Sequence, residues 1–315
     1  MKKTYLKYFL ALILYGSNGI IIRHIPLSSH KIVLYRTLIG GIFLITLFLY
    51  RRHRSAEESG VTSKKRFQIQ KKQALCLLIS GASIGTSWIF LYEAYRYVGV
   101  GVATLVYYCG PVFVMLLSPL LFRERITGRK AFGFGLVLLG MIFLNGTSLL
   151  EGGLSTGLLF CLIAALLFAG MVIFSKKASD ISGLDSSMYQ IIASFVTVAV
   201  YSFFREPSLS YFREMGSDLS GNLLPLLILG ILNTGIANYL YFSAIPKLPV
   251  QTVSACSYLE PLSALAFSVV LLGEAFSPLQ MAGALLILGG SMFDECVSLL
   301  RHHPPRRITR HAFIR

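Results

Sequence analysis

One acidic residue of this sequence lies inside a long apolar stretch, where a charge is costly. Glu260 is about eleven residues into the run 250–272, which contains no other charged side chain. An acid at the centre of a membrane helix costs roughly 2.5–3.5 kcal/mol on insertion scales, so we expect Glu260 to face a cavity or a partner. It would serve as a counter-ion for a cationic group or as a proton site. The alternative is a structural carboxylate that neighbouring helices satisfy beside a bend at Pro261.

Aromatic and amide side chains of other apolar stretches could share a cavity with this acid. Trp88, the only tryptophan of the chain, is followed by Tyr92 and Tyr95 at helical spacing, which places all three on one helix face. Aromatic rings attract cations through their quadrupoles, although packing between helices uses the same residues. The complete set of predicted cavity residues is Glu260, Trp88, Tyr92, Tyr108, Tyr258, Asn238, Asn18 and Tyr15.

Prolines, a cation and a second acid have structural as well as functional interpretations. Pro111 and Pro261 each remove a helix hydrogen bond, which predicts either hinges or static bends. Arg36 lies about 7 Å inside the end of its apolar stretch, and it either extends to the membrane surface or attracts an anion. Glu274 precedes a helix with a capping-box sequence at 277–280, and we expect it to stabilise a helix start.

The stretches that must position these residues are long and apolar. The chain has 315 residues, 55% of them hydrophobic and 14% charged, whereas a soluble domain carries about 25% charged residues. Ten stretches approach the roughly 20 residues that a membrane-spanning helix needs. They are Tyr5–Ile22, Ile32–Tyr50, Ala74–Tyr95, Val100–Phe122, Ala131–Leu144, Leu154–Phe174, Ser187–Phe204, Leu223–Ile245, Val250–Leu272 and Leu279–Val297. The sequence therefore predicts an all-α, polytopic membrane protein with ten transmembrane helices.

Basic residues predict which side of the membrane each connection faces. Most of the 29 Lys and Arg residues flank the apolar stretches on one side. The connections on the other side hold only Arg23, Lys31, Arg96, Arg205 and Arg213. Because positively charged loops remain in the cytoplasm, both termini, including the basic tail 298–315, are predicted to be cytoplasmic in a cell membrane. The same placement favours membrane lipids over nucleic acid as partners of this chain, whose net charge is +15.

The chain contains an internal repeat with an offset of 150 residues. The superposed pairs are Gly85 and Gly235, Tyr108 and Tyr258, Pro111 and Pro261, Ser118 and Ser268, Glu124 and Glu274, Gly133 and Gly283, and Gly140 and Gly290. The same shift places Asn238 on Trp88, so both are predicted to face one cavity. Two repeats, 5–144 and 154–297, would hold five helices each. Because five is odd, the repeats would be inverted, and inverted repeats place a binding site near the bilayer midplane at their interface.

Two short motifs recur in these repeats. The second repeat has Tyr258-Leu-Glu-Pro261 and Leu271-Leu-Gly-Glu274, followed by Gln280 and Gly283, and the first has a weaker copy with Tyr108-Cys-Gly-Pro111, Arg123-Glu124 and Gly133. In these motifs, and over roughly residues 8 to 295, the sequence resembles the EamA-type family of the drug/metabolite transporter superfamily. The resemblance implies five plus five helices around a central cavity. It also implies export or exchange of amino acids, related metabolites or cationic compounds by alternating access.

A membrane-embedded enzyme, receptor or scaffold is the alternative class. Only Glu260 of the 14 acids lies deep in an apolar stretch, and the sequence lacks paired-aspartate, HExxH, Walker and GxSxG motifs. Its His and Cys residues do not have metal-ligand spacing, so no metal and no cofactor is expected. Without an ATP-binding motif, the predicted transport is secondary or facilitative, with a small-molecule substrate and protons as candidate partners.

Overall fold

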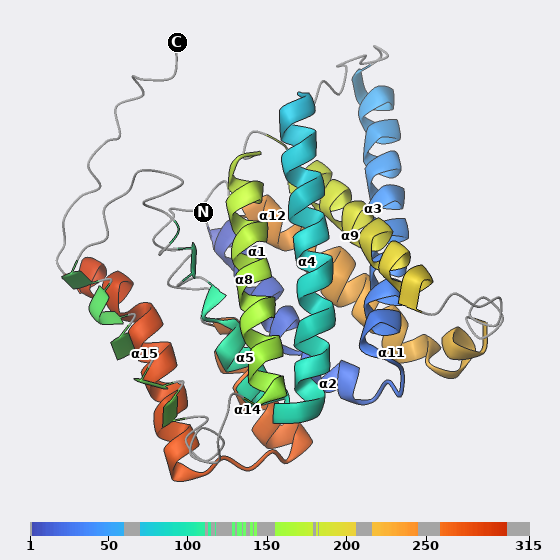
Figure 1. Cartoon of the computed structure of the whole chain (residues 1–315). Helices are drawn as coiled ribbons and strands as arrows, with labels where there is room; N and C mark the ends of the chain where they lie inside the picture. Colours follow the sequence, from blue (N-terminus) through green and yellow to red (C-terminus); the bar gives the residue numbers. More distant parts are fainter. Residues whose placement is uncertain are drawn as a thin grey trace.

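Every regular element in the described part of the chain is a helix. The computed structural model describes residues 2–59, 70–110, 155–178, 183–205, 216–244 and 259–300, together with Ile181 and short helical pieces between 113 and 143. In the first half the helices are α1 (Lys2–Gly16), α2 (Asn18–Arg23), α3 (Ser29–Ser59), α4 (Lys71–Val98) and α5 (Val100–Tyr107). In the second half they are α8 (Thr156–Lys176), α9 (Gly183–Arg205), α11 (Leu223–Leu227), the π-helix η1 (Ile228–Ile236), α12 (Ala237–Ala244), α14 (Leu259–Leu272) and α15 (Pro278–Leu300). In Figure 1, α4 lies between α8 and α9, and α9 lies between α4 and α3.

Six helical stretches of the described residues are long and apolar enough to cross a membrane. They are Thr4–Arg23, Ser29–Arg54, Lys71–Val98, Thr156–Ser175, Gly183–Arg205 and Leu223–Ala244. Each coincides with a predicted stretch, which confirms the first, second, third, sixth, seventh and eighth. Two shorter apolar helices, Leu259–Leu272 and Pro278–Gly290, coincide with parts of the predicted ninth and tenth stretches, the second starting one residue earlier than predicted. The predicted fourth stretch begins as α5, and its remainder and the predicted fifth lie in the region that is described only in pieces.

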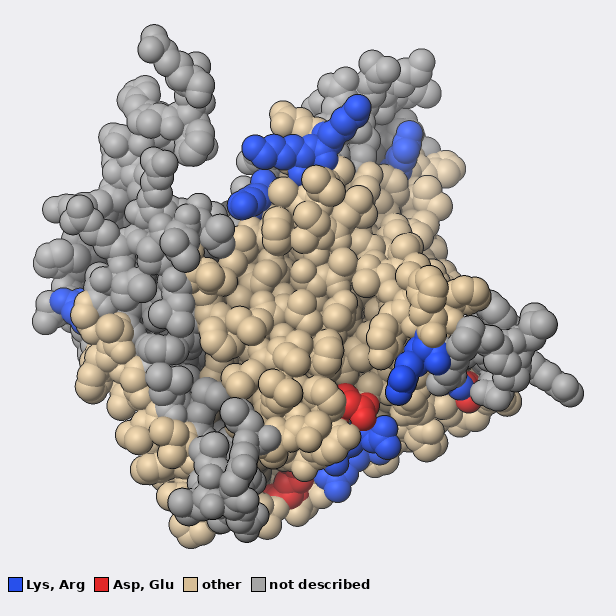
Figure 2. All heavy atoms as spheres, viewed as in Figure 1, with Lys and Arg blue, Asp and Glu red and all other residues tan. Residues whose placement is uncertain are grey.

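Charged side chains gather at the two ends of the bundle. On the face that Figure 2 shows, basic residues lie at one end and mixed basic and acidic residues at the other, with a broad uncharged belt over α4, α8 and α9 between them. Large apolar side chains are exposed on these three helices, among them Leu75, Leu78, Leu159, Leu166, Val196 and Val200. Lipid tails can solvate such a surface, whereas water cannot without a large free-energy cost. The chain is a multi-pass membrane protein.

The helices of the two halves contact one another in the same pattern. Helix α1 packs against α12 and α14, and its counterpart α8 packs against α4 and α5. Helix α3 packs against η1 in the way that its counterpart α9 packs against α4. Counterparts also contact each other. Helix α3 packs against α9, and α5 packs against α14, which belong to the equivalent fourth and ninth stretches. Such a pattern is typical of two related halves and favours the internal repeat.

Glycines that the repeat superposes also meet across the interface of the halves. A Cβ on Gly133 would lie 2.5 Å from the backbone oxygen of Gly290, and a Cβ on Gly140 would lie 2.6 Å from that of Gly283. Residue numbers therefore rise along one segment as they fall along the other, so these equivalent segments cross antiparallel. Small residues at a helix crossing allow the backbones to approach this closely.

Candidate functional site

Glu260 lies where α1 approaches α14. It is the second residue of α14, and the residues before Leu259 are outside the described part of the chain. A Cβ on Gly16 would be 3.0 Å from the Glu260 backbone oxygen and would collide with the Ser263 hydroxyl. Glycine at position 16 thus allows the two helices to come together beside the acid. The side chain of Tyr108 lies within hydrogen-bonding reach of the Glu260 carboxyl group.

Five tyrosines surround Glu260 closely enough to interact with its charge. They come from α1, α4, α12 and the end of α5, and are Tyr15, Tyr95, Tyr107, Tyr108 and Tyr241. Tyr15 and Tyr241 meet edge to face with 5.6 Å between ring centroids, and Tyr107 and Tyr108 do so at 6.0 Å. Aromatic rings and phenolic oxygens near a carboxylate suit a cation.

Arg36 of α3 is completely buried. Its Nε donates a 2.8 Å hydrogen bond to the Thr234 hydroxyl. Its guanidinium carbon lies 4.2 Å from the ring centroid of Trp88 and 5.6 Å from that of Tyr92. Its Nη1 and Nη2 have no hydrogen-bond partner in the described part of the chain. Of the two interpretations of this arginine, extension to the membrane surface is wrong, because neighbouring helices cover it.

A π-helix links Arg36 to the surroundings of Glu260. Thr234, which accepts the bond from Arg36, belongs to η1. Asn238, at the start of α12, donates to the Thr234 backbone oxygen at 2.6 Å and accepts a 2.9 Å hydrogen bond from the Tyr15 hydroxyl. A hydrogen-bonded chain therefore runs from Tyr15, beside Glu260, to Arg36. π-Helical turns frequently occur at functional sites.

Part of the predicted cavity set lies in this connected centre, namely Glu260, Tyr108, Tyr15 and Asn238. Trp88 joins it through Arg36, because the guanidinium group lies over the indole ring. The ring of Trp88 therefore already contacts a cation of the protein itself, which the sequence did not predict.

The remaining predicted residues have other placements. Tyr92 and Asn18 each retain a buried side-chain oxygen without a hydrogen-bond partner among the described residues. Pro261 is buried in α14. Tyr258 and the predicted hinge Pro111 lie outside the described residues.

The predicted cavity set omits several members of the centre, which are Tyr95, Tyr107, Tyr241 and Thr234. Helical spacing had placed Tyr95 on the face of Trp88 and Tyr92, and Tyr107 precedes the predicted Tyr108. Tyr241 and Thr234 resemble the many other aromatic and hydroxyl residues of the chain, so the sequence held no signal that would have singled them out. Arg36 did carry a signal, because it is a cation several residues inside a predicted membrane stretch, whereas Lys7 lies at the very start of its stretch.

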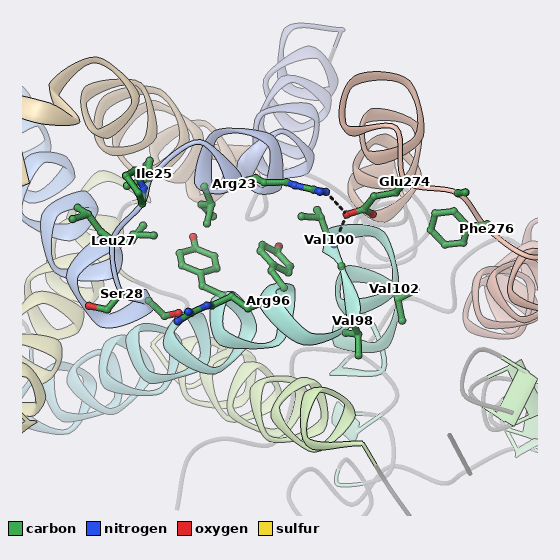
Figure 3. Close-up of a pocket in the computed structure, with 18 of the residues that line it drawn as sticks. Arg23, Ile25, Leu27, Ser28, Arg96, Val98, Val100, Val102, Glu274 and Phe276 are labelled. Atoms are coloured by element: carbon green, nitrogen blue, oxygen red, sulfur yellow. Dashed lines mark hydrogen bonds and ion pairs between the residues drawn. The ribbon is translucent and has the colours of Figure 1, made fainter. Parts of the chain in front are cut away.

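A cavity of about 920 Å³ opens at the end of the bundle where α2 meets α3 (Figure 3). Its walls are the α2–α3 connection, the end of α4, the start of α5 and the connection between α14 and α15. Tyr92 and Tyr95 line it and stack with 5.7 Å between their ring centroids. Tyr92 also borders Arg36 and Tyr95 interacts with Glu260, so the cavity shares two wall residues with the surroundings of these charges.

Glu274 joins three segments at the mouth of this cavity (Figure 3). Its carboxylate accepts hydrogen bonds from the backbone nitrogens of Val100 at 2.9 Å and Gly101 at 3.0 Å, and from Arg23 at 3.1 Å. Glu274 does stabilise a helix start, but the helix is α5 of the other half and not the following helix for which the sequence predicted it. The helix that follows Glu274 in sequence, α15, has its own capping box at 277–280.

A cluster of cations and one aromatic ring lies at the opposite end of the bundle. Arg51 of α3 donates a hydrogen bond to the Tyr239 hydroxyl, and its guanidinium carbon is 4.8 Å from the ring centroid. Lys7 of α1 places its Nζ 5.8 Å from the same centroid. This cluster connects α1, α3 and α12 and belongs to the end that carries mainly basic residues.

Apolar spanning helices around a polar centre, with a cavity that shares wall residues with it, are the features of a membrane transporter. Comparison with known families agrees. The chain belongs to the EamA-like transporter family, whose pattern it matches twice, over residues 2–146 and 155–293. The resemblance inferred from the sequence is confirmed, and the family places the chain among transporters rather than enzymes.

Known relatives are similar at low identity. The uncharacterized transporter YxxF of Bacillus subtilis is 24% identical over 289 residues, which cover 90% of this chain and 87% of that protein. A probable amino-acid metabolite efflux pump of Salmonella typhimurium is 27% identical over 232 residues, with coverage of 71% and 78%. The riboflavin transporter ImpX of Fusobacterium nucleatum is 24% identical over 224 residues, with coverage of 68% and 72%. One crystal structure with 17% identity has the same fold, with a TM-score of 0.64 over 96% of this chain and 100% of that one.

Proposed function

We propose that this transporter moves a small metabolite with an amino group, an amino acid or a related amine, as a secondary or facilitative exporter or exchanger. The observation that carries the proposal is the partly buried Glu260 carboxyl group, which has tyrosines near it and Tyr108 within hydrogen-bonding reach. The ion pairs of the described residues involve Glu274, Asp218 and Glu93, not Glu260. A substrate ammonium group or a proton can therefore balance its charge.

Two inverted repeats of five helices, 5–144 and 154–297, would be the bodies that move. The symmetric helix contacts and the antiparallel crossing of matched glycines support this arrangement. A twofold axis in the membrane plane relates repeats of this kind, and the substrate site lies on their interface. Glu260 and Arg36 come from different repeats, as a site at that interface requires.

Alternating access would connect the centre to one side of the membrane at a time. The cavity lies at the end with Arg23 and Arg96, which the charge distribution assigns to the outside. The Arg51 cluster lies at the end assigned to the cytoplasm, together with both termini. Rocking of the halves would separate Arg51 from Tyr239 and narrow the cavity around Glu274.

The names of the relatives agree with a small organic substrate. The efflux pumps of Salmonella typhimurium and Escherichia coli are named for amino-acid metabolites, and the relative of Fusobacterium nucleatum is named for riboflavin. A carboxylate in an aromatic lining suits the amino group of the first substrate class better than the uncharged ring system of the second.

Flux measurements with Glu260→Gln test the proposal. The substitution preserves the shape of the side chain and removes its charge. In proteoliposomes we expect it to abolish uptake of the amino acids or amines that the wild-type protein moves, or to remove the pH dependence of uptake. Glu93→Gln is the matched control, because Glu93 accepts a bond from Ser29 at 2.7 Å and pairs with Arg96 at the outer end.

Three outcomes are informative. Normal size-exclusion behaviour with lost flux in Glu260→Gln, and retained flux in Glu93→Gln, supports the proposal. Unchanged flux and an unchanged pH profile in Glu260→Gln return this acid to a structural role. If the wild-type protein binds ligands and supports no flux for any of them, the receptor or scaffold alternative holds.

A further inference from the structure

Arg36 carries a charge that the described part of the chain leaves unbalanced. Its side chain is completely buried, and Nη1 and Nη2 have no hydrogen-bond partner there. A buried charge without a partner is strongly destabilising, so native proteins rarely leave one without a function. By contrast, Arg23 forms an ion pair with the carboxylate of Glu274, and Lys31 forms one with the carboxylate of Asp218.

The neighbours of Arg36 hold the guanidinium group in one orientation. The hydrogen bond to Thr234 fixes Nε. The guanidinium carbon lies over the Trp88 ring, 4.2 Å from its centroid, and 5.6 Å from the centroid of the Tyr92 ring. What remains free is the fork formed by the two terminal nitrogens. This fork matches the two oxygens of a carboxylate, which it can bind through parallel hydrogen bonds.

The wall of the cavity comes close to this fork. Tyr92, whose ring borders the guanidinium group, lines the cavity. Ile32, one helical turn before Arg36 on α3, lines it as well. Arg36 is not itself part of this wall, so an anion in the cavity would reach the fork once the Tyr92 side chain moves aside.

The same tyrosines interact with Arg36 and with Glu260. Tyr15, Tyr95 and Tyr107 each interact electrostatically with both charged groups. The two opposite charges thus share these neighbours, and they do not form an ion pair with each other among the described residues. A ligand with both an ammonium and a carboxylate group would neutralise both.

We propose that the terminal nitrogens of Arg36 bind the carboxylate of the substrate, so that the cargo is a zwitterionic amino acid rather than a simple amine. This proposal rests on the proposed function and adds the second pole of the site. Arg36 would be a binding residue that selects for the carboxylate, whereas Glu260 would bind the amino group.

The position of Trp88 permits a direct test, because it is the only tryptophan of the chain and contacts Arg36. Its emission is recorded on the full-length protein in lipid nanodiscs while each standard amino acid other than tryptophan is added up to its solubility limit. The amino acid with the strongest saturable response is then compared with its decarboxylated amine and its methyl ester. Sodium chloride at equal ionic strength separates carboxylate binding from binding of any small anion.

We expect the free amino acid to change the emission. Its amine and its ester should bind at least about tenfold more weakly, because the loss of a charge-assisted bond exceeds the 1.4 kcal/mol that corresponds to a tenfold change in affinity. Arg36→Gln should abolish the response, and Arg36→Lys should retain it only in part. Arg52→Gln, an exposed arginine on the same helix, is the matched control and should behave as wild type. The comparison of ligands on the wild-type protein needs no substitution and remains decisive if Arg36→Gln does not fold.

The outcomes separate this inference from the proposed function. Equal binding of the amino acid and its amine, a response to chloride alone, or no saturable response to any amino acid overturns the carboxylate site. If amines cross proteoliposome membranes with dependence on Glu260 while Arg36→Gln changes nothing, the proposed function stands and this inference fails. If an amino acid binds saturably in a way that depends on Arg36, but the protein does not move it across proteoliposome membranes, the carboxylate site stands and the proposed transport of that amino acid fails.

Discussion

Two charged side chains inside apolar stretches, Glu260 and Arg36, distinguish the centre of this membrane protein. Glu260 was identified from the sequence because a lone acid in an apolar stretch must have a partner or a function. Arg36 was ambiguous, since a long basic side chain near a helix end can reach the membrane surface. The fold covers it with Trp88 and η1 instead, so both charges remain inside.

The first half lacks a counterpart of Glu260. Under the 150-residue shift, Gly110 takes its position. A Cβ at Gly110 would lie 2.6 Å from the ring of Phe168, so an aromatic side chain occupies the space that an acid would need. The carboxylate of the centre is therefore contributed by the second half alone, even though the helices around it are arranged symmetrically.

At the same scale, Glu274→Gln should loosen the start of α5. The substitution removes the negative charge to which Val100 N, Gly101 N and Arg23 donate. The glutamine side chain keeps one carbonyl oxygen as an acceptor in place of two carboxylate oxygens. We expect a loss of about 1 kcal/mol in stability, the typical value of a charged group at a helix N-terminus. Thermal unfolding measures the loss, and hydrogen exchange should locate it at Val100 and Gly101.

Gln280→Ala is the matched control for this prediction. It breaks the capping box of α15 in the same connection, because Gln280 accepts from Ser277 N at 2.9 Å. It does not touch α5, so exchange at Val100 and Gly101 should stay at the wild-type rate. Equal exchange at these two amides in both variants would show that Glu274 does not hold α5.

At the scale of helices, close backbone approach determines how the halves fit together. A Cβ on Gly140 would lie 2.6 Å from the Gly283 backbone oxygen, closer than any real contact, whereas one on Gly135 would meet nothing within 4 Å. Gly140→Ala should therefore destabilise the protein by about 1–3 kcal/mol, the usual cost of overpacking. Gly135→Ala should be neutral or stabilising by up to about 1 kcal/mol, because alanine favours helix more than glycine does.

Thermal unfolding of the two alanine variants under identical conditions checks this difference. A similar unfolding temperature for Gly140→Ala and Gly135→Ala would contradict the antiparallel crossing of the matched segments. A large loss in Gly140→Ala alone would support it, together with the inverted repeat that it implies.

At the scale of the whole molecule, the charge distribution predicts the orientation in the membrane. A cysteine added after Arg315, in a chain without its five native cysteines, should not react with an impermeant reagent applied to intact cells. A cysteine in place of Tyr97, whose side chain is 57% exposed at the cavity end, should react. Reaction of the tail would reverse the orientation and leave the inverted repeat without its topological support.

Alternating access makes a separate prediction for the centre. Thr104 is buried and lies 3.4 Å from the hydroxyl of Tyr95, which lines the cavity. A cysteine at position 104 should react from the cavity side only, and Arg51→Ala should shift its reactivity toward the cytoplasmic side, because the contact with Tyr239 is lost. Simultaneous reaction from both sides in the wild-type background would indicate a channel.

The sequence by itself determined the membrane class, most of the spanning helices and the family. These follow from the lengths of uncharged stretches and from short motifs such as Tyr258-Leu-Glu-Pro261, which are local properties of the chain. Tertiary structure decided which side chains meet. Glu274 caps α5 rather than α15, and the Trp88 ring faces Arg36 rather than an empty cavity. No local pattern encodes such choices, because they arise from packing between helices that are far apart in sequence. The physical reason is that burial forces each polar group to find a partner wherever the fold brings one within reach.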